Sequence, residues 1–334
     1  MIVGQSTASH AMLASLRRFA ACAVPVLLEG ETGTGKELAA REIHYAGLRA
    51  QKPFVPVNCG ALPDSLIESE LFGHRRGAFT DAKSEQPGLV ELAQGGTLFL
   101  DEVDTLSPKA QVTLLRFLQD HEYRPVGGRV ARTADVRIVA ATNASLEQLS
   151  LDRRFRRDLY YRLNALYLRL LPLRERTADI APLAQHFLTV AVRQLGATPK
   201  RWTDAALAAL AAHAWPGNVR ELENIALRAC VNTDGPDVGV AELATADPAF
   251  VAAQAGPPRE SARDTSFSAS KARAIASFER SFLTDLLRNA RANRGIGATY
   301  CRNSDFRRCR CARRGAAHPL RAECRGNKHP ALAT

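Results

Sequence analysis

Short apolar runs alternate with helical patterns over the first half of the chain. Four runs rich in Val, Leu, Ile and Phe are candidate strands, at residues 24–28, 54–57, 97–100 and 136–141. Continuous apolar strands separated by helices are typical of a parallel sheet that is buried on both faces. Residues 1–172 are therefore predicted to form a three-layer α/β domain.

The pattern changes at about residue 173. Candidate strands stop there, and Ala- and Leu-rich segments with helical spacing follow at residues 180–195 and 203–213. This spacing predicts a small helical domain over residues 173–232. Residues 233–272 are rich in Gly, Pro, Ala, Asp and Ser with little periodicity, which is typical of a linker.

One more helix is expected within residues 273–294. Its apolar face is formed by Phe278, Phe282, Leu283, Leu286 and Leu287. After Arg294 the periodicity ends, and residues 295–334 hold isolated apolar residues among Arg, Cys and Gly.

The net charge of +11 belongs mainly to the end of the chain. Residues 291–334 carry eleven basic side chains against two acidic ones, a surplus of nine that leaves +2 for the rest. The part before residue 291 is therefore nearly neutral, and charge favours nucleic-acid binding only for the tail.

Length and composition indicate a globular protein of more than one domain. The 334 residues suffice for two domains and part of a third, with 46% hydrophobic residues. No apolar run approaches the roughly 18 residues that span a bilayer, and no signal peptide is evident, so a cytoplasmic protein is expected. Cys22, Cys59 and Cys230 lie in apolar segments, which predicts small buried thiols rather than a disulfide framework.

A glycine-rich loop follows the first candidate strand and precedes a helical segment. In this context backbone N–H groups and a helix N-terminus can surround phosphate groups, while a lysine reaches the outer ones. The common pattern has Ser or Thr after that lysine, where this chain has Glu; a strand-to-helix turn without nucleotide is the alternative. The predicted nucleotide-binding residues are Gly30, Glu31, Thr32, Gly33, Thr34, Gly35, Lys36 and Glu37.

Two acidic residues, Asp101 and Glu102, directly follow the candidate strand at residues 97–100. One carboxylate can hold the shell of a magnesium ion while its neighbour polarises an attacking water, as phosphoryl transfer requires. The alternative is a solvated strand end that caps a helix. Together with the glycine loop, the pair favours the catalytic interpretation.

Six segments occur in order: residues 30–37 (GETGTGKE), 77–82 (GAFTDA), 97–102 (TLFLDE), 141–143 (ATN), 155–162 (FRRDLYYR) and 215–222 (WPGNVREL). This ordered set resembles the AAA+ ATPase domain of bacterial enhancer-binding proteins, which activate RNA polymerase carrying the sigma-54 factor. The resemblance covers about residues 2–231. It implies a P-loop NTPase fold with a helical lid, and ATP and Mg²⁺ as cofactors.

The same resemblance assigns roles to polar residues at strand ends. By this resemblance, Asp101 binds the magnesium ion and Glu102 polarises the attacking water. A glutamate such as Glu37 is usual in the family at the position after the loop lysine. Asn58 holds the Glu102 side chain and releases it with nucleotide state, and Asn143 senses the γ-phosphate. By sequence alone, each Asn is an ordinary turn residue.

Three arginines match family positions that act on the nucleotide. Arg156 and Arg162 fit the arginine fingers, which a neighbouring subunit supplies, and Arg220 fits the sensor arginine that reaches from the lid. Fingers in trans imply a ring, usually a hexamer. Without the resemblance, Arg220 is a surface residue, and the basic stretch at residues 153–162 is the solvated face of a helix. For Arg153, Arg154 and Arg157, the finger role and the solvated face both stay open.

Residues 69–74 and 77–82 resemble the surface loop that enhancer-binding proteins press against sigma-54. An exposed aromatic beside a small hydroxyl suits transient docking. The fifth position of the loop is usually glycine; Asp81 lacks its backbone freedom and adds a negative charge, although Asp tolerates left-handed conformations. Residues 125–129 are expected to form a second loop that moves with the first. The predicted sigma-54 contact residues are Gly77, Ala78, Phe79, Thr80, Asp81 and Ala82.

Both ends differ from the family pattern. The chain begins almost directly on the ATPase core, so either a separate protein regulates it or the chain is a fragment of a longer regulator. Residues 273–294 resemble the first helix of a Fis-type helix-turn-helix domain, which binds enhancer DNA. For residues 295–334, with cysteines 301, 309, 311 and 324, a zinc site and a disordered basic arm remain alternatives. A frameshift that replaced the rest of the domain is favoured, because the helical pattern stops abruptly.

The preferred function is an ATP-hydrolysing activator that remodels closed complexes of sigma-54 RNA polymerase into open ones. The alternative is a DNA-associated regulator that binds ATP and assembles but is uncoupled from sigma-54 by Asp81 and lacks a complete DNA-binding domain. A general AAA+ unfoldase or chelatase motor is disfavoured, because those classes do not call for the loop at residues 77–82.

Overall fold

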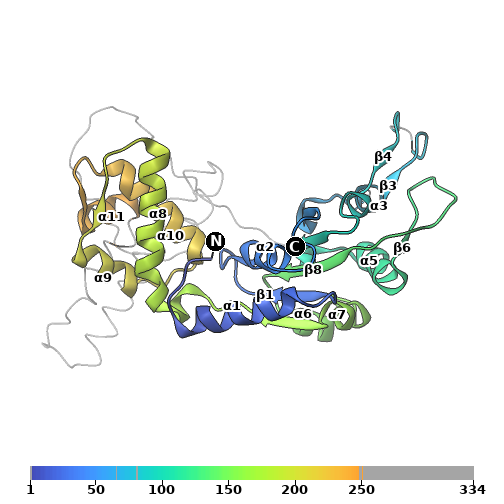
Figure 1. The fold of residues 1–334 in the computed structure, drawn as a ribbon, viewed down its shortest axis with the longest axis horizontal. Coiled ribbons are helices and arrows are strands. Elements are labelled where there is room, and N and C mark those ends of the chain that lie inside the picture. The colour runs from blue at the N-terminus through green and yellow to red at the C-terminus, as the bar shows by residue number, and fades with distance from the viewer. Residues whose placement is uncertain (1, 65, 80–81, 248–249, 251–334) are drawn as a thin grey trace, which may run out of the picture. The chain divides into compact units, whose positions relative to one another are not determined.

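The computed structural model describes residues 2–64, 66–79, 82–247 and 250. A five-stranded sheet with strand order β2-β5-β8-β1-β9 forms its centre, and every neighbouring pair is parallel (Figure 1). The strands are β1 (Val26–Glu29), β2 (Phe54–Asn58), β5 (Thr97–Asp101), β8 (Arg137–Thr142) and β9 (Leu166–Arg169). Because the strands are parallel, the carboxyl ends of β5 and β8 lie at the same edge as the glycine loop.

Successive side chains of the inner strands enter two different cores. Leu98, Leu100 and Ile138 belong to one core, and Phe99 and Val139 to the other. This alternation is the ordinary consequence of the pleat, and it explains why successive central positions of these strands are apolar.

Helices cover both faces of the sheet. The first face carries α1 (Thr7–Ala20) and α2 (Lys36–Tyr45), and the second carries α3 (Ile67–Phe72), α4 (Leu89–Leu92), α5 (Pro108–Asp120), α6 (Leu146–Leu151) and α7 (Arg157–Leu163). Polar side chains fix several starts: the hydroxyl groups of Ser6, Ser107 and Ser145 each accept a backbone N–H three residues on. The predicted three-layer α/β architecture is confirmed.

Two short hairpins extend from the second face. Strand β3 (Gly73–His74) pairs with β4 (Gln86–Pro87), and β6 (Glu122–Tyr123) pairs with β7 (Arg132–Thr133), each antiparallel. The hairpins are joined through Val126, whose N–H donates to Gly73 (2.8 Å) and whose carbonyl accepts from Arg75 (3.0 Å). The segment that contains the predicted contact loop is therefore hydrogen-bonded to the predicted second loop. Both hairpins extend from the same end of the α/β domain (Figure 1).

A helical lid follows the sheet domain. It begins with the 3₁₀ turns η3 (Leu173–Glu175) and η4 (Thr177–Asp179) and continues through α8 (Ile180–Leu195), β10 (Arg201–Trp202), α9 (Asp204–Ala212), α10 (Asn218–Asn232), β11 (Asp237–Val238) and α11 (Val240–Ala246). Trp202, Trp215 and Phe250 anchor a separate core between these helices. No helix in the described ranges is long and apolar enough to cross a membrane.

The structure differs from the sequence predictions at three places. Strand β9 and the two-residue strand β10 were not among the predicted strands. The predicted linker begins at residue 233, but β11 and α11 pack there, and Leu243 and Phe250 enter the lid core. Cys22 is exposed, because it lies just past the end of α1, whereas Cys59 and Cys230 are buried as predicted.

The predicted helix within residues 273–294 and the basic tail at residues 295–334 lie outside the described residues.

Candidate active site

The glycine loop lies between β1 and α2 at the carboxyl edge of the sheet. Gly30 N–H donates to the carbonyl of Thr142 on β8 (3.2 Å), and Lys36 is the first residue of α2. Gly35 precedes the helix at φ +100°, a left-handed conformation that glycine adopts without steric cost. Because the first N–H groups of a helix have no partner within it, this end of α2 suits phosphate groups.

The lysine of the loop is buried and bent back onto its own backbone. Lys36 Nζ donates to the carbonyl oxygens of Gly30 (2.7 Å) and Glu31 (3.2 Å). Burial lowers the pKa of Lys36, and nearby carboxylates, with Asp101 the strongest, act in the opposite direction. An ammonium in this place can exchange its carbonyl partners for phosphate oxygens.

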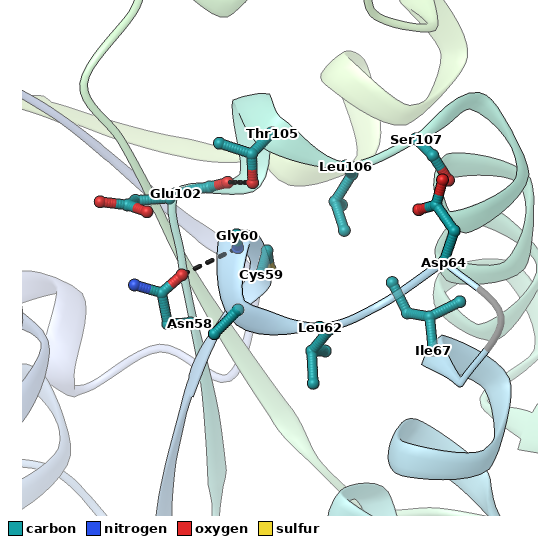
Figure 2. A pocket seen from close by; sticks show the side chains of 11 residues that line it. Asn58, Cys59, Gly60, Leu62, Asp64, Ile67, Glu102, Thr105, Leu106 and Ser107 are labelled. Carbon is teal, nitrogen blue, oxygen red and sulfur yellow. Dashed lines mark hydrogen bonds between the residues drawn. The ribbon is translucent and has the colours of Figure 1, made fainter.

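The two strand-end acids differ in conformation. Asp101 ends β5, and burial raises its pKa. Glu102 has φ +55° and ψ +44°, a left-handed conformation that is uncommon outside glycine and frequent at functional sites. Thr105 holds it there, because its N–H (3.0 Å) and Oγ1 (2.7 Å) both donate to the Glu102 carbonyl (Figure 2).

A cavity of about 290 Å³ brings together residues from three of the predicted segments, 30–37, 97–102 and 215–222. It is lined by Thr32, Gly33, Gly35, Lys36, Glu37, Leu38, Asp101, Glu102, Val219, Arg220 and Glu223. Loop, lysine, paired acids and lid arginine are the groups that phosphoryl transfer requires. Of the lid residues, Arg220 is exposed and can move toward a bound phosphate.

A second cavity, of about 240 Å³, shares Gly35, Leu38 and Val219 with the first and is mainly apolar. Arg176 lines it while buried: Nη2 donates to the Thr34 carbonyl (3.0 Å), and Nε has no partner among the described residues. An apolar cavity beside a phosphate-binding loop can hold the base of a nucleotide. Thr34 of the glycine loop also lines it. The remaining lining residues, which the sequence did not single out, are Ile2, Val3, Met12, Ala39, Leu170, Leu183, His186 and Phe187.

The lid is bonded directly to the tip of the glycine loop. Asn218 is fully buried at φ +53°, and its Nδ2 donates to Glu31 Oε2 and to the Thr32 carbonyl (both 3.1 Å). Arg174 forms an ion pair with Glu31 (2.5 Å). Hydrogen bonds from Arg174 and Asn218 lower the pKa of Glu31 to about 2. Glu31 therefore links the loop to the lid.

Asn58 and Glu102 line a further cavity, of about 690 Å³, at the end of β2 (Figure 2). Asn58 Oδ1 accepts the N–H of Gly60 (2.8 Å), and in the described part of the chain no hydrogen bond joins Asn58 to Glu102. Gly60 lies beside both groups, since a Cβ there would be 3.0 Å from Glu102 Oε2 and 3.2 Å from Asn58 Oδ1. The two side chains are close enough for the switch role of Asn58, which stays a prediction.

Asn143 and the two finger arginines do not line the 290 Å³ cavity. Asn143 follows β8 and is exposed. Arg156 precedes α7 and pairs with Asp158 through two hydrogen bonds (3.0 and 2.7 Å), whereas Arg162 in the last turn of α7 is exposed. Neither arginine therefore lines the chain's own nucleotide cavity, and the finger role of both stays a prediction.

The predicted contact loop is held at its base and exposed at Phe79. Gly77 N–H donates to the Ala82 carbonyl (2.8 Å), and Ala82 is buried. The Phe79 ring is 37% exposed and packs on His74, with 4.9 Å between ring centroids. His74 Nδ1 is in turn 2.8 Å from Ser69 Oγ. Thr80 and Asp81 lie outside the described residues.

A parallel sheet of this order, with a glycine loop after β1, paired acids after β5 and a helical lid against the loop, defines an ATP-binding P-loop domain of the AAA+ class. The match to known families agrees. Residues 2–169 match the sigma-54 interaction domain, and residues 174–255 match the AAA+ ATPase lid domain. The chain belongs to the family of sigma-54-dependent transcriptional activators.

The curated relatives that this chain matches are named as regulatory proteins. The Nif-specific regulatory protein of Azotobacter vinelandii is 50% identical over 70% of this chain and 45% of its own length. The transcriptional regulator NtrC of Rhizobium meliloti is 50% identical over 68% of this chain and 47% of its own length. The sigma-54-dependent activator SfnR of Pseudomonas putida is 51% identical over 65% of this chain and 59% of its own length. The chain thus spans about half the length of the curated relatives it matches.

Among solved structures, NtrX from Brucella abortus in complex with ATP has a TM-score of 0.69 and 34% identity. The match covers 75% of this chain and 55% of that one. NtrX in complex with ADP has a TM-score of 0.67 and 35% identity, and the match covers 72% of this chain and 54% of that one.

Proposed function

We propose that this protein hydrolyses ATP and uses the energy to convert closed complexes of sigma-54 RNA polymerase into open promoter complexes. The observation that carries the proposal is one cavity lined by the glycine loop, Lys36, Asp101, Glu102 and Arg220. The loop of residues 77–82, bonded at its base to the hairpin that follows α5, is the part that would press against sigma-54.

ATP is the substrate, and its binding divides between the two adjoining cavities. The phosphates lie at the N-terminus of α2 with Lys36, and the base enters the apolar cavity beside Arg176. Asp101 would hold Mg²⁺, which would neutralise charge on the phosphates, and its half-buried carboxylate suits a hard cation. Glu102, fixed by Thr105, orients the attacking water.

Hydrolysis is coupled to assembly. Arg162 and Arg156 act as fingers on the nucleotide of a neighbouring copy, so that the active form is a ring, most simply a hexamer. The protein acts in the cytoplasm, where sigma-54 holoenzyme is its partner. Binding to enhancer DNA would require residues 273–294, which lie outside the described residues.

The test is open-complex formation by sigma-54 holoenzyme on a suitable promoter, with enough protein to bypass tethering at an enhancer. The unmodified chain is compared with Asp81→Gly, and ATP with a non-hydrolysable analogue. Glu102→Gln serves as the control that keeps the fold and the binding cavity but loses the group that orients water.

We expect melting by the unmodified chain with ATP and none with the analogue or with Glu102→Gln. Melting by Asp81→Gly alone would show a working motor that is uncoupled at one residue of the loop, and the alternative function would hold. ATP turnover without melting by either chain would contradict the activator function.

A further inference from the structure

Asp104 connects the segment that carries Glu102 to the strand end that carries Asn143. Asp104 lies in the 3₁₀ turn η2 (Val103–Thr105), and its Oδ1 accepts a hydrogen bond from Thr142 Oγ1 on β8 (2.7 Å). We propose that Asp104 and Thr142 are positioning residues of the ATP site, which set the Asn143 amide against Glu102 and the γ-phosphate. This inference rests on the proposed ATPase function.

The direction of the hydrogen bond follows from the single proton of the hydroxyl group. Thr142 Oγ1 is within reach of two acceptors, Asp104 Oδ1 (2.7 Å) and the Ala144 carbonyl (2.9 Å). The same oxygen accepts the Ala144 N–H (3.1 Å). A carboxylate is the stronger acceptor, so the proton goes to Asp104 and the turn around Asn143 is closed by the Ala144 N–H.

Thr142 is also fixed to the glycine loop. It is the last residue of β8, pairs in register with Glu29 of β1, and accepts the Gly30 N–H at its carbonyl (3.2 Å). Its side chain is completely buried. One residue therefore joins the glycine loop through its backbone and the acidic segment through its hydroxyl group.

The turn η2 is rigid at its other end as well. Thr105 Oγ1 and N–H hold the carbonyl of Glu102 (Figure 2), and Val103 is buried in the sheet core. The turn thus bonds Glu102 through Thr105 and bonds Thr142, the residue before Asn143, through Asp104. A shift at either end must move the other.

Asn143 has no side-chain anchor of its own in the described part of the chain. It is exposed, and no hydrogen bond of its amide occurs there. Its place is therefore set by the backbone of residues 142–144, which depends on the Thr142 hydroxyl group. The charge of Asp104 also raises the pKa of Lys36 against the effect of burial, which agrees with a location beside the phosphates.

Nucleotide binding tests the proposal without requiring hydrolysis. The dissociation constants of a non-hydrolysable ATP analogue and of ADP are measured with Mg²⁺ by calorimetry for the full chain. In Asp104→Ala and Thr142→Val, we expect affinity for the analogue to fall about three- to tenfold relative to ADP, the size of one lost hydrogen bond. Asn143→Ala should give the same selective loss.

Three further variants separate positioning from general damage. Thr142→Ser keeps the hydroxyl group and should restore most of the selectivity. The double variant Asp104→Ala with Thr142→Val should lose no more than either single one, because both remove the same bond. Thr113→Val is the matched control, since the Thr113 hydroxyl group also donates to a carboxylate, that of Glu68 (3.4 Å), away from the nucleotide cavity.

Equal losses for the analogue and ADP, additive losses in the double variant, or unchanged selectivity in Asp104→Ala would each overturn the proposal. A chain that shows the expected selectivity but opens no promoter would contradict the activator function alone.

Discussion

At the scale of single residues, two glycines of the loop are required for different reasons. Gly33 and Gly35 both have positive φ, +78° and +100°. A Cβ on Gly33 would lie 2.3 Å from the carbonyl oxygen of Gly217 in the lid, whereas a Cβ on Gly35 would meet nothing within 4 Å. Gly33 is therefore a packing requirement as well as a conformational one.

We predict that Gly33→Ala destabilises the protein more than Gly35→Ala. Gly35→Ala should cost about 1–2 kcal/mol in the free energy of unfolding, from the left-handed conformation alone. Gly33→Ala should cost a further 1–3 kcal/mol or so, because the methyl group forces the loop away from the lid. Urea unfolding of both variants measures the difference, and equal costs would argue against tight loop–lid contact in solution.

At the scale of elements, the lid is tied to the segment before α1 through one buried acid. Asp179 ends η4 and is fully buried, and it accepts hydrogen bonds from Gln5 N–H (2.6 Å), Ser6 N–H (2.7 Å), Ser6 Oγ (2.8 Å) and Ser9 Oγ. Burial alone would raise the pKa of Asp179, but hydrogen bonds from Ser9 and Ser6 outweigh it and the pKa lies below its usual value. Residues 2 and 3 of the same segment line the apolar cavity, so this contact also shapes the base site.

We predict that Asp179→Asn lowers the free energy of unfolding by roughly 2–4 kcal/mol, since two hydroxyl groups lose a charged acceptor. The pKa of Asp179 is lower in the folded than in the unfolded state. Its contribution to the free energy of unfolding is therefore complete at pH values above the ordinary pKa of aspartate, and it is lost as the pH falls through the folded-state pKa. Urea unfolding of both chains between pH 7 and acid checks this.

The difference between Asp179→Asn and the unmodified chain should be constant near neutral pH and shrink on acidification. Ser15→Ala is a suitable control, because the Ser15 hydroxyl group only bonds within α1. A difference that grows toward acid would contradict the assigned pKa direction.

At the scale of the whole molecule, the nucleotide cavity of one chain lacks the two arginines that were predicted as fingers. The nucleotide cavity contains Lys36 and Arg220 as its cationic side chains, and neither Arg156 nor Arg162 lines it. Arg156 is engaged with Asp158, so Arg162 is the arginine more available to a neighbour. If a second copy supplies an arginine to this nucleotide cavity, as we propose, the exposed Arg162 is the residue that can do so.

We predict that Lys36→Ala and Arg162→Ala each abolish most ATP turnover and that mixing the two restores part of it. Loss of a finger arginine typically costs about 10³-fold or more in rate. In a mixed ring, some interfaces combine an intact Lys36 with an intact Arg162. ATPase activity of the separate and mixed variants measures this. Arg201→Ala is the control, because Arg201 is an exposed arginine that pairs with Asp237 in the lid. No recovery on mixing would contradict a finger in trans.

The sequence by itself determined the architecture and the polar groups that meet in the 290 Å³ cavity. Apolar runs of strand length, a glycine loop and acids at a strand end are local patterns, and a parallel sheet places strand ends at one edge whatever the loops do. Lys36, Asp101 and Glu102 could therefore be assigned before their contacts were known. The lid helices at residues 180–195 and 203–213 followed from helical periodicity in the same way.

Only the tertiary structure decided the rest, because those features depend on contacts between distant segments. Strand β9 is four residues long and none of its side chains is fully buried, so it lacks the continuous apolar run of the inner strands, and α11 acquires its core by packing on α9 and α10. The bond of Asn218 to Glu31 and the Asp104–Thr142 link join residues far apart in the chain. Such contacts are fixed by the packing of the folded chain, and no period in the sequence encodes them.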